Sequence, residues 1–137
     1  MNPIEYRRDA PLDIDQAREL YRTSTLGERR PIDDRSRFEA MLRHANLVIT
    51  AWDGDLLVGI ARSLTDFAHS TYLADLAVRV SHQHRGIGRE LVRLTQVHGG
   101  PAMIVLIAAP KAQAYYPKLG FQAEPRAWTR RPPAEPA

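Results

Sequence analysis

The sequence contains no cysteine, and this absence removes several functions at once. Without cysteine there is neither a disulfide framework nor a thiol nucleophile, and the composition is typical of a reducing compartment. No apolar run approaches the roughly 20 residues that a membrane-spanning helix needs. Residues 1–7 also lack the apolar core of a secretory signal. We therefore expect a cytoplasmic protein without a membrane partner.

The excess of charge of one sign is small, because 19 Lys and Arg residues stand against 16 Asp and Glu residues, a formal net charge of +3. The basic residues are scattered along the chain, whereas a nucleic-acid-binding domain gathers them on one surface. We therefore do not expect nucleic acid as the main partner. A length of 137 residues suffices for one buried core. We expect a single domain over 1–130 and a disordered, proline-rich tail over 131–137.

The hydrophobic pattern predicts elements in the order β-α-α-β-β-β-α-β-α-β. Strands 47–52 and 56–61 flank Asp-Gly at positions 53–54, which is a strong hairpin signal. The order of strand 71–78, helix 88–98 and buried strand 103–108 predicts a crossover between parallel strands. The other predicted elements are strand 4–8, helix 13–22 with Asp13 as its N-cap, a helix that Asp33 or Asp34 opens, helix 111–118, and one or two strands in 121–130. This is an α/β (α+β) fold with about four flanking helices.

One segment carries most of the functional signal, and we name it the glycine loop: residues 83–88, with the sequence QHRGIG. It runs from a predicted strand into the start of a predicted helix. Such a loop offers several backbone N–H groups to an anion, and the helix dipole adds to the attraction. At Gly86 and Gly88 a Cβ atom would hold ligand oxygens away from these amides. The pattern predicts a diphosphate site; the alternative is a strand-to-helix turn without a ligand.

Two motifs resemble those of the GNAT superfamily of acyl-CoA N-acyltransferases. The pattern Gln-x-x-Gly-x-Gly of the glycine loop is similar to the superfamily's acetyl-CoA pyrophosphate loop. Residues 114–121, AYYPKLGF, resemble its C-terminal signature, in which a tyrosine precedes a Gly-Phe pair. The resemblance implies a mixed, mostly antiparallel sheet in which two central parallel strands splay apart. It also implies direct acetyl transfer from acetyl-CoA, within a ternary complex, to a primary amine of a small molecule, protein or peptide.

The resemblance also implies roles for individual residues. Tyr116 stands where the family has its general acid, and a phenol with a pKa near 10 can protonate a departing thiolate. Main-chain groups of Leu76, Ala77 and Val78 would bind the pantetheine arm and the thioester carbonyl, while their side chains belong to the core. The pyrophosphate would be bound by the amides and side chains at the start of the helix: His84, Arg85, Gly86, Ile87, Gly88 and Arg89.

The base and the acceptor site are less well defined. Polyamine-type relatives have a Glu-Asp pair where this chain has Ala74 and Asp75, so the glutamate is missing. Asp75 could accept a proton through water, or it could serve the structure by pairing with an arginine. The missing glutamate leaves a second function open, a catalytically degenerate CoA-binding regulatory module. An acetyltransferase that acts on aminoacyl-tRNA is a third.

The loop between the first two predicted helices, residues 25–30, is expected to wall the acceptor side. Arg29 and Arg30 of this loop could hold a carboxylate or phosphate. Trp52 and Tyr72 could line the cleft, although strand aromatics are more often part of the core. Neither His82 nor His84, which flank the glycine motif, has a partner at metal-ligand spacing, so no metal site is expected. The sequence identifies neither the acceptor nor the oligomeric state, and a homodimer stays open.

Overall fold

The computed structural model describes residues 3–24 and 26–133. The chain divides into two units, residues 1–107 and 108–137, which are described separately. The first unit contains a five-stranded sheet with the order β1-β2-β3-β4-β5. Its strands are β1 (Glu5–Arg8), β2 (Leu47–Asp53), β3 (Leu56–Thr65), β4 (Ser70–Val78) and β5 (Met103–Val105). Three neighbouring pairs are antiparallel and β4 and β5 are parallel, so the predicted mixed, mostly antiparallel sheet is confirmed.

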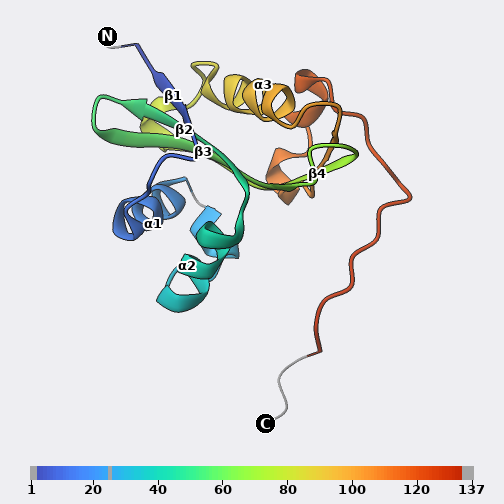
Figure 1. Ribbon diagram of the computed structural model, residues 1–137, viewed down its shortest axis with the longest axis horizontal. Helices are drawn as coiled ribbons and strands as arrows, with labels where there is room; N and C mark the ends of the chain where they lie inside the picture. The colour runs from blue at the N-terminus through green and yellow to red at the C-terminus, as the bar shows by residue number, and fades with distance from the viewer. Residues whose placement is uncertain (1–2, 25, 134–137) are drawn as a thin grey trace. The chain divides into compact units, whose positions relative to one another are not determined.

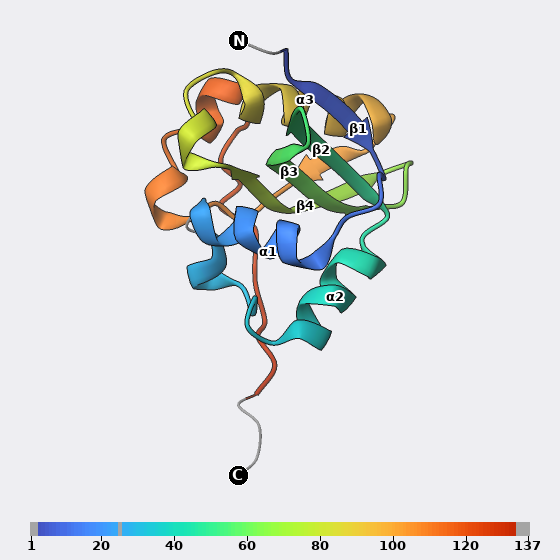
Figure 2. The same cartoon turned by 90° about the vertical axis from the view of Figure 1, so that its left-hand side faces the viewer.

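The helices of the first unit cover the two faces of this sheet (Figures 1 and 2). Helices α1 (Ile14–Thr23) and α2 (Arg35–His44) lie on one face, and α3 (Ile87–His98) lies on the other. Each of the first two helices begins at an aspartate whose carboxylate accepts a hydrogen bond from a backbone N–H of the first turn. Asp13 accepts from Gln16 at 2.9 Å, and Asp34, rather than Asp33, accepts from Arg37 at 3.2 Å.

The core of the first unit lies between α1, α2 and the sheet. On α1 the buried side chains are Ala17, Leu20 and Tyr21, which follow the helical period. The Tyr21 ring meets the Phe38 ring of α2 edge-on, with centroids 5.0 Å apart. Ala77 of β4 belongs to the same buried cluster, which agrees with the core position predicted for its side chain.

Two irregularities of β4 give the sheet its functional shape. Opposite β3, Leu73 pairs with Ser63 and Asp75 pairs with Arg62, so Ala74 is an extra residue that forms a β-bulge. On the other side, β5 pairs only with residues 70–72 of β4. From residue 73 onward, no described strand lies beside this edge of β4. The parallel pairing ends after three residue pairs because β5 ends at Val105, and the splay that the resemblance implies stays a prediction.

The second unit corrects two predictions. In place of helix 111–118 it has two short 3-10 segments, Pro110–Ala112 and Tyr116–Leu119, and described residues 121–133 contain no strand. Prolines begin or lie near the start of both segments, and Gly120 has a left-handed φ of 92°, so no long helix forms. In the first unit, β5 is shorter than predicted, and Met103 and Val105 are exposed rather than buried.

Residues 131–133 have neither helix nor strand, and residues 134–137 of the predicted tail lie outside the described residues. A single domain over 1–130 stays a prediction. In the part of the chain that the structure describes, every helix is too short or too polar to cross a bilayer.

Candidate functional site

The glycine loop connects the C-terminal end of β4 to the start of α3. A short 3-10 turn, Val80–His82, precedes it, and Gly86 is the N-cap of α3 with φ 81° and ψ 5°. A Cβ atom on Gly86 would meet no atom within 4 Å, so the left-handed backbone, not close packing, requires glycine there. His84 is also left-handed, with φ 63°. Such backbone turns can direct neighbouring N–H groups to one side, and those of the first helical turn have no partner within the helix.

Side chains that were not among the predicted site residues hold the base of this loop. Gln83 Nε2 donates to the carbonyl of Val78 at 3.0 Å. The buried His82 ring lies with Nε2 2.9 Å from Asp53 Oδ2 and Nδ1 2.7 Å from the Ser81 hydroxyl. His82 thereby links the start of the loop to the β2–β3 hairpin. Its position one residue before the loop motif was the only sequence signal for this role.

A buried arginine, Arg79, holds the chain between β4 and the glycine loop. Arg79, at the end of β4, donates through Nε and Nη2 to the carbonyl of Leu57 and through Nη1 to Glu19 of α1. The end of β4 is therefore tied to β3 and α1 just before the chain turns into the loop. Arg85 and Arg89, which were predicted to reach phosphate oxygens, are exposed side chains at the start of α3.

On the face of the sheet that α1 and α2 cover, four residues form what we name the Asp75 cluster: Tyr21, Arg30, Arg62 and Asp75. Asp75 is 2% exposed, and both its carboxylate oxygens accept hydrogen bonds. Arg30 Nε donates to Oδ1 at 2.6 Å, while Arg62 Nε and the Tyr21 hydroxyl donate to Oδ2, also at 2.6 Å each. Arg62 donates further to the carbonyl of Met41 at 3.2 Å. The cluster thus joins α1, the α1–α2 connection, α2, β3 and β4.

The protonation of Asp75 follows from these contacts. Burial acts to raise its pKa, but the hydrogen bond and charge of Arg62, the Tyr21 hydroxyl and the charge of Arg30 outweigh it and hold the pKa below its usual value. Burial, followed by the charge of Asp75, raises the pKa of Tyr21 well above that of an ordinary phenol. A carboxylate with a lowered pKa and both oxygens occupied is a weak proton acceptor. The geometry therefore favours the structural one of the two roles considered for Asp75.

Arg30 also contacts the bulge in β4. Its Nη2 donates to the carbonyl of Ala74 at 2.9 Å and its Nη1 to the carbonyl of Arg29 at 2.9 Å. The Arg29 side chain is exposed, whereas that of Arg30 is 22% exposed. Thr25, the first residue of this predicted acceptor wall, lies outside the described residues. Arg62 was not among the predicted site residues, because strand 56–61 was expected to end before it; β3 continues to Thr65, so Arg62 lies within a buried strand and needs a partner there.

In the second unit, the Tyr-Gly-Phe signature folds into a local turn. The Tyr116 carbonyl accepts from the backbone N–H of Phe121 at 3.2 Å, and Gly120 supplies the left-handed residue between them. The Tyr116 ring meets the ring of Phe121 edge-on at 5.5 Å and that of Tyr115 at 5.4 Å. The neighbouring Tyr115 is 37% exposed. The role of Tyr116 stays a prediction.

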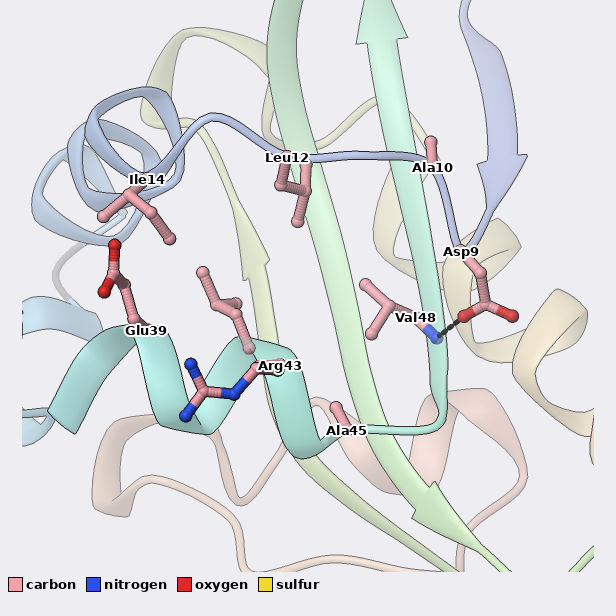
Figure 3. Close-up of a pocket in the computed structure, with 9 residues that line it drawn as sticks. Asp9, Ala10, Leu12, Ile14, Glu39, Arg43, Ala45 and Val48 are labelled. Atoms are coloured by element: carbon pink, nitrogen blue, oxygen red, sulfur yellow. Dashed lines mark hydrogen bonds between the residues drawn. The ribbon is translucent and has the colours of Figure 1, made fainter. Parts of the chain in front are cut away.

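In the first unit, a cavity of about 400 Å³ lies between the segment after β1 and helix α2 (Figure 3). Glu39 and Arg43 of α2 line it together with apolar residues such as Leu12. Its lining includes none of the predicted site residues.

Comparisons with known proteins agree with this geometry. A family model described as an acetyltransferase (GNAT) domain matches residues 44–123, which include β2 to β5, the glycine loop and the Tyr-Gly-Phe turn. Among solved structures, a GNAT-family acetyltransferase from Streptococcus pneumoniae is 22% identical, with 95% of this chain and 100% of that chain covered and a TM-score of 0.72.

Two aminoglycoside acetyltransferases have the same fold. AAC(6')-Iy, in complex with the bisubstrate analogue CoA-S-monomethyl-acetylneamine, is 17% identical, with 97% of this chain and 100% of that chain covered and a TM-score of 0.72. An enzyme from an uncultured soil metagenomic sample, in complex with sisomicin, is 20% identical, with 96% and 97% covered and a TM-score of 0.69. At these identities the likeness shows the fold.

Proposed function

The chain belongs to the GNAT acetyltransferase family, and on this premise we propose that it transfers the acetyl group of acetyl-CoA directly to a primary amine in a ternary complex. One observation carries the proposal. A loop with a left-handed glycine at the start of α3 adjoins a β4 edge that lacks a described strand neighbour from residue 73 onward. The first feature suits a diphosphate, and the second suits an extended chain of amides.

Acetyl-CoA supplies an activated thioester, and the residues present fit its parts. Backbone N–H groups from Arg85 to Arg89 would bind the pyrophosphate, with His84 and the two arginine side chains at its edge. Main-chain groups of residues 76–78 would pair with the pantetheine arm. A backbone N–H of this strand would also stabilise the negative charge that develops on the thioester oxygen, an effect typically worth a few kcal/mol.

Tyr116 would complete the reaction as the general acid. A phenol with a pKa near 10 is protonated at neutral pH and so can donate to the CoA thiolate. The conjugate thiol has a pKa near 8.5, so this transfer is uphill by about 1.5 pKa units, roughly 2 kcal/mol, which is a small cost for a catalysed step. The acceptor must react as a neutral amine, yet an alkyl ammonium with a pKa near 10.4 is only about 0.04% neutral at pH 7. We assign Asp75 to positioning Arg30 and Arg62 rather than to removing this proton. A positive charge near the acceptor lowers the pKa of the ammonium and so raises the neutral fraction.

The experiment is thiol release from acetyl-CoA across a panel of amines, with CoA binding measured by calorimetry. Turnover with at least one amine supports the proposed transfer. Tight CoA binding without turnover on any amine would instead indicate a regulatory CoA-binding module. If an aminoacyl-tRNA were the acceptor, the apparent affinity would fall steeply with salt concentration. A cytoplasmic location stays a prediction, and a homodimer stays open.

A further inference from the structure

The Asp75 cluster carries an unbalanced buried charge. Arg30 and Arg62 supply two positive charges, and Asp75 supplies one negative charge. Asp75 is 2% exposed, Arg62 8% and Tyr21 0%, so water screens this group poorly. Buried charges are normally paired, because an unpaired one loses its hydration without compensation. One positive charge of the cluster therefore has no carboxylate of its own within the cluster.

Arg30 is the member of the cluster that can receive a further group. It donates three hydrogen bonds, to Asp75, Ala74 and Arg29, out of the five N–H bonds of a guanidinium. Its side chain is 22% exposed, whereas the Arg62 side chain is 10% exposed, so Arg30 is the arginine of the cluster that solvent reaches more. Its planar head is already fixed by the three bonds, which reduces the entropy lost when an anion binds.

The place of Arg30 connects it with the acceptor. It donates to the bulge carbonyl of Ala74, two residues before Leu76, where the proposed thioester site on β4 begins. It directly follows the 3-10 segment Leu26–Arg29 of the α1–α2 connection, the expected acceptor wall. The connection itself also contains three acidic residues. Glu28 is exposed beside Arg29, Asp33 Oδ1 lies 3.7 Å from Arg22 Nη2, and Asp34 accepts the capping hydrogen bond of α2, so none of the three is hydrogen-bonded to Arg30.

We propose that the amine acceptor of this enzyme also carries an anionic group, a carboxylate or a phosphate, and that Arg30 binds this group. The inference rests on the proposed function, since it names the class of acceptor for the same site. Asp75 and the carbonyls of Ala74 and Arg29 hold Arg30 in place, and the surplus positive charge attracts the anion. The same charge repels a polycation. An aminoglycoside such as sisomicin, with which one structural neighbour forms a complex, is therefore a poor acceptor for this chain.

The first test uses the unmodified enzyme and matched acceptors. One arm compares an amino acid with its carboxamide, and a second compares phosphoethanolamine with ethanolamine, with sisomicin as the polycation. Thiol release at saturating acetyl-CoA gives kcat/KM for each. We expect the anionic member of at least one pair to be preferred by about tenfold or more, which is the effect of one charge-assisted pair. A larger ratio of kcat/KM between amino acid and carboxamide identifies the anionic group as a carboxylate, and a larger ratio between phosphoethanolamine and ethanolamine identifies it as a phosphate.

Failure of the inference and failure of the proposed function give different results. If the neutral members or sisomicin are the better acceptors, the inference is wrong while the acetyltransferase stands. If no acceptor supports thiol release, the proposed function is wrong, and the inference fails with it.

A second test assigns the preference to Arg30. In Arg30→Gln we expect the anionic-to-neutral ratio of kcat/KM to fall below about threefold, mainly through a higher KM for the anionic acceptor. Arg30→Lys should restore part of the ratio, because the charge returns without the fork geometry. Arg93→Gln removes the same charge from α3, on the opposite face of the sheet, and should leave the ratio unchanged. A purely structural Arg30 would lower kcat/KM for both members equally, and an unchanged ratio in Arg30→Gln would overturn the assignment.

Discussion

Replacement of Asp75 by asparagine tests whether this carboxylate is a structural centre or a catalytic base. The two side chains have nearly the same shape, so the change removes a charge and little volume. It leaves Arg30 and Arg62 without their carboxylate partner, although the amide oxygen can still accept one or two hydrogen bonds. Removing one partner of a buried ion pair typically costs about 3 to 5 kcal/mol. Because of the remaining hydrogen bonds, we expect a cost at the lower end of this range, about 3 kcal/mol.

This loss is large against a total stability of roughly 5 to 15 kcal/mol for a domain. Urea unfolding followed by circular dichroism measures this loss. We expect a lower urea concentration at the unfolding midpoint and an unchanged dependence of the free energy of unfolding on urea concentration. Tyr21→Phe is the matched control. It removes one of the three hydrogen bonds to the same carboxylate without removing the charge, and should cost about 1.5 to 3 kcal/mol. A loss of stability below about 1 kcal/mol in Asp75→Asn would refute the structural role, because removal of one partner of a buried ion pair costs more free energy than that.

The difference in the free energy of unfolding between wild type and Asp75→Asn depends on pH, and the direction of this dependence follows from the pKa of Asp75. The folded pKa of Asp75 lies below its ordinary value of 3.8, so its contribution to stability is present above that pH and is lost as the pH falls through the folded pKa. The stability gap between wild type and Asp75→Asn should therefore be constant near neutrality and shrink below pH 3.8. Hydrogen bonds from the backbone N–H groups of His69, Ala68 and Ser70 lower the pKa of Asp66 to about 2. Asp66 titrates in the same way in both proteins, so its contribution cancels in the difference between them.

The remaining predictions concern the cofactor and the proton. Gly86→Val should lower the affinity for CoA in calorimetry by about tenfold or more, because a β-branched residue disfavours the left-handed backbone at this position. Gly100, just beyond the other end of α3, is also left-handed with φ 67°, so Gly100→Val is the control for backbone strain away from the glycine loop. Tyr116→Phe should lower kcat about a hundredfold with the KM for acetyl-CoA within about threefold, and an unchanged kcat would place the acid elsewhere. His82→Gln should raise the KM for acetyl-CoA about fivefold by loosening the loop, whereas an unchanged KM would mean that the hairpin contact does not position it.

Local signals in the sequence predicted the parts of this fold that depend on neighbouring residues. Asp13 caps α1 and Gly54 supports the β2–β3 hairpin, with φ 59°, because caps and tight turns are determined by a few adjacent side chains. Gly86 occupies its left-handed position for the same reason. The helix expected over 111–118 was wrong because proline at 117 lacks the backbone N–H that a continuous helix would need in the middle of this segment.

The Asp75 cluster could not be assembled from the sequence. Arg62 lies 13 residues and Arg30 45 residues from Asp75 along the chain, and no local pattern pairs residues at such separations. The bulge at Ala74 likewise depends on how β3 and β4 align, which the composition of either strand alone does not determine. Asp75 was a candidate because of its position on the strand, and its partners decide which of its two roles the geometry favours.

The most direct test of the proposed coenzyme site is the response of backbone amides to CoA, measured by proton–nitrogen NMR on the isotopically labelled full chain. We predict that the largest shifts fall on the N–H groups of residues 85–89, with a second set along 76–78. Removing the pyrophosphate, by using pantetheine alone, should abolish the first set and keep the second. CoA binding that leaves the amides at the start of α3 unchanged would contradict the proposed site.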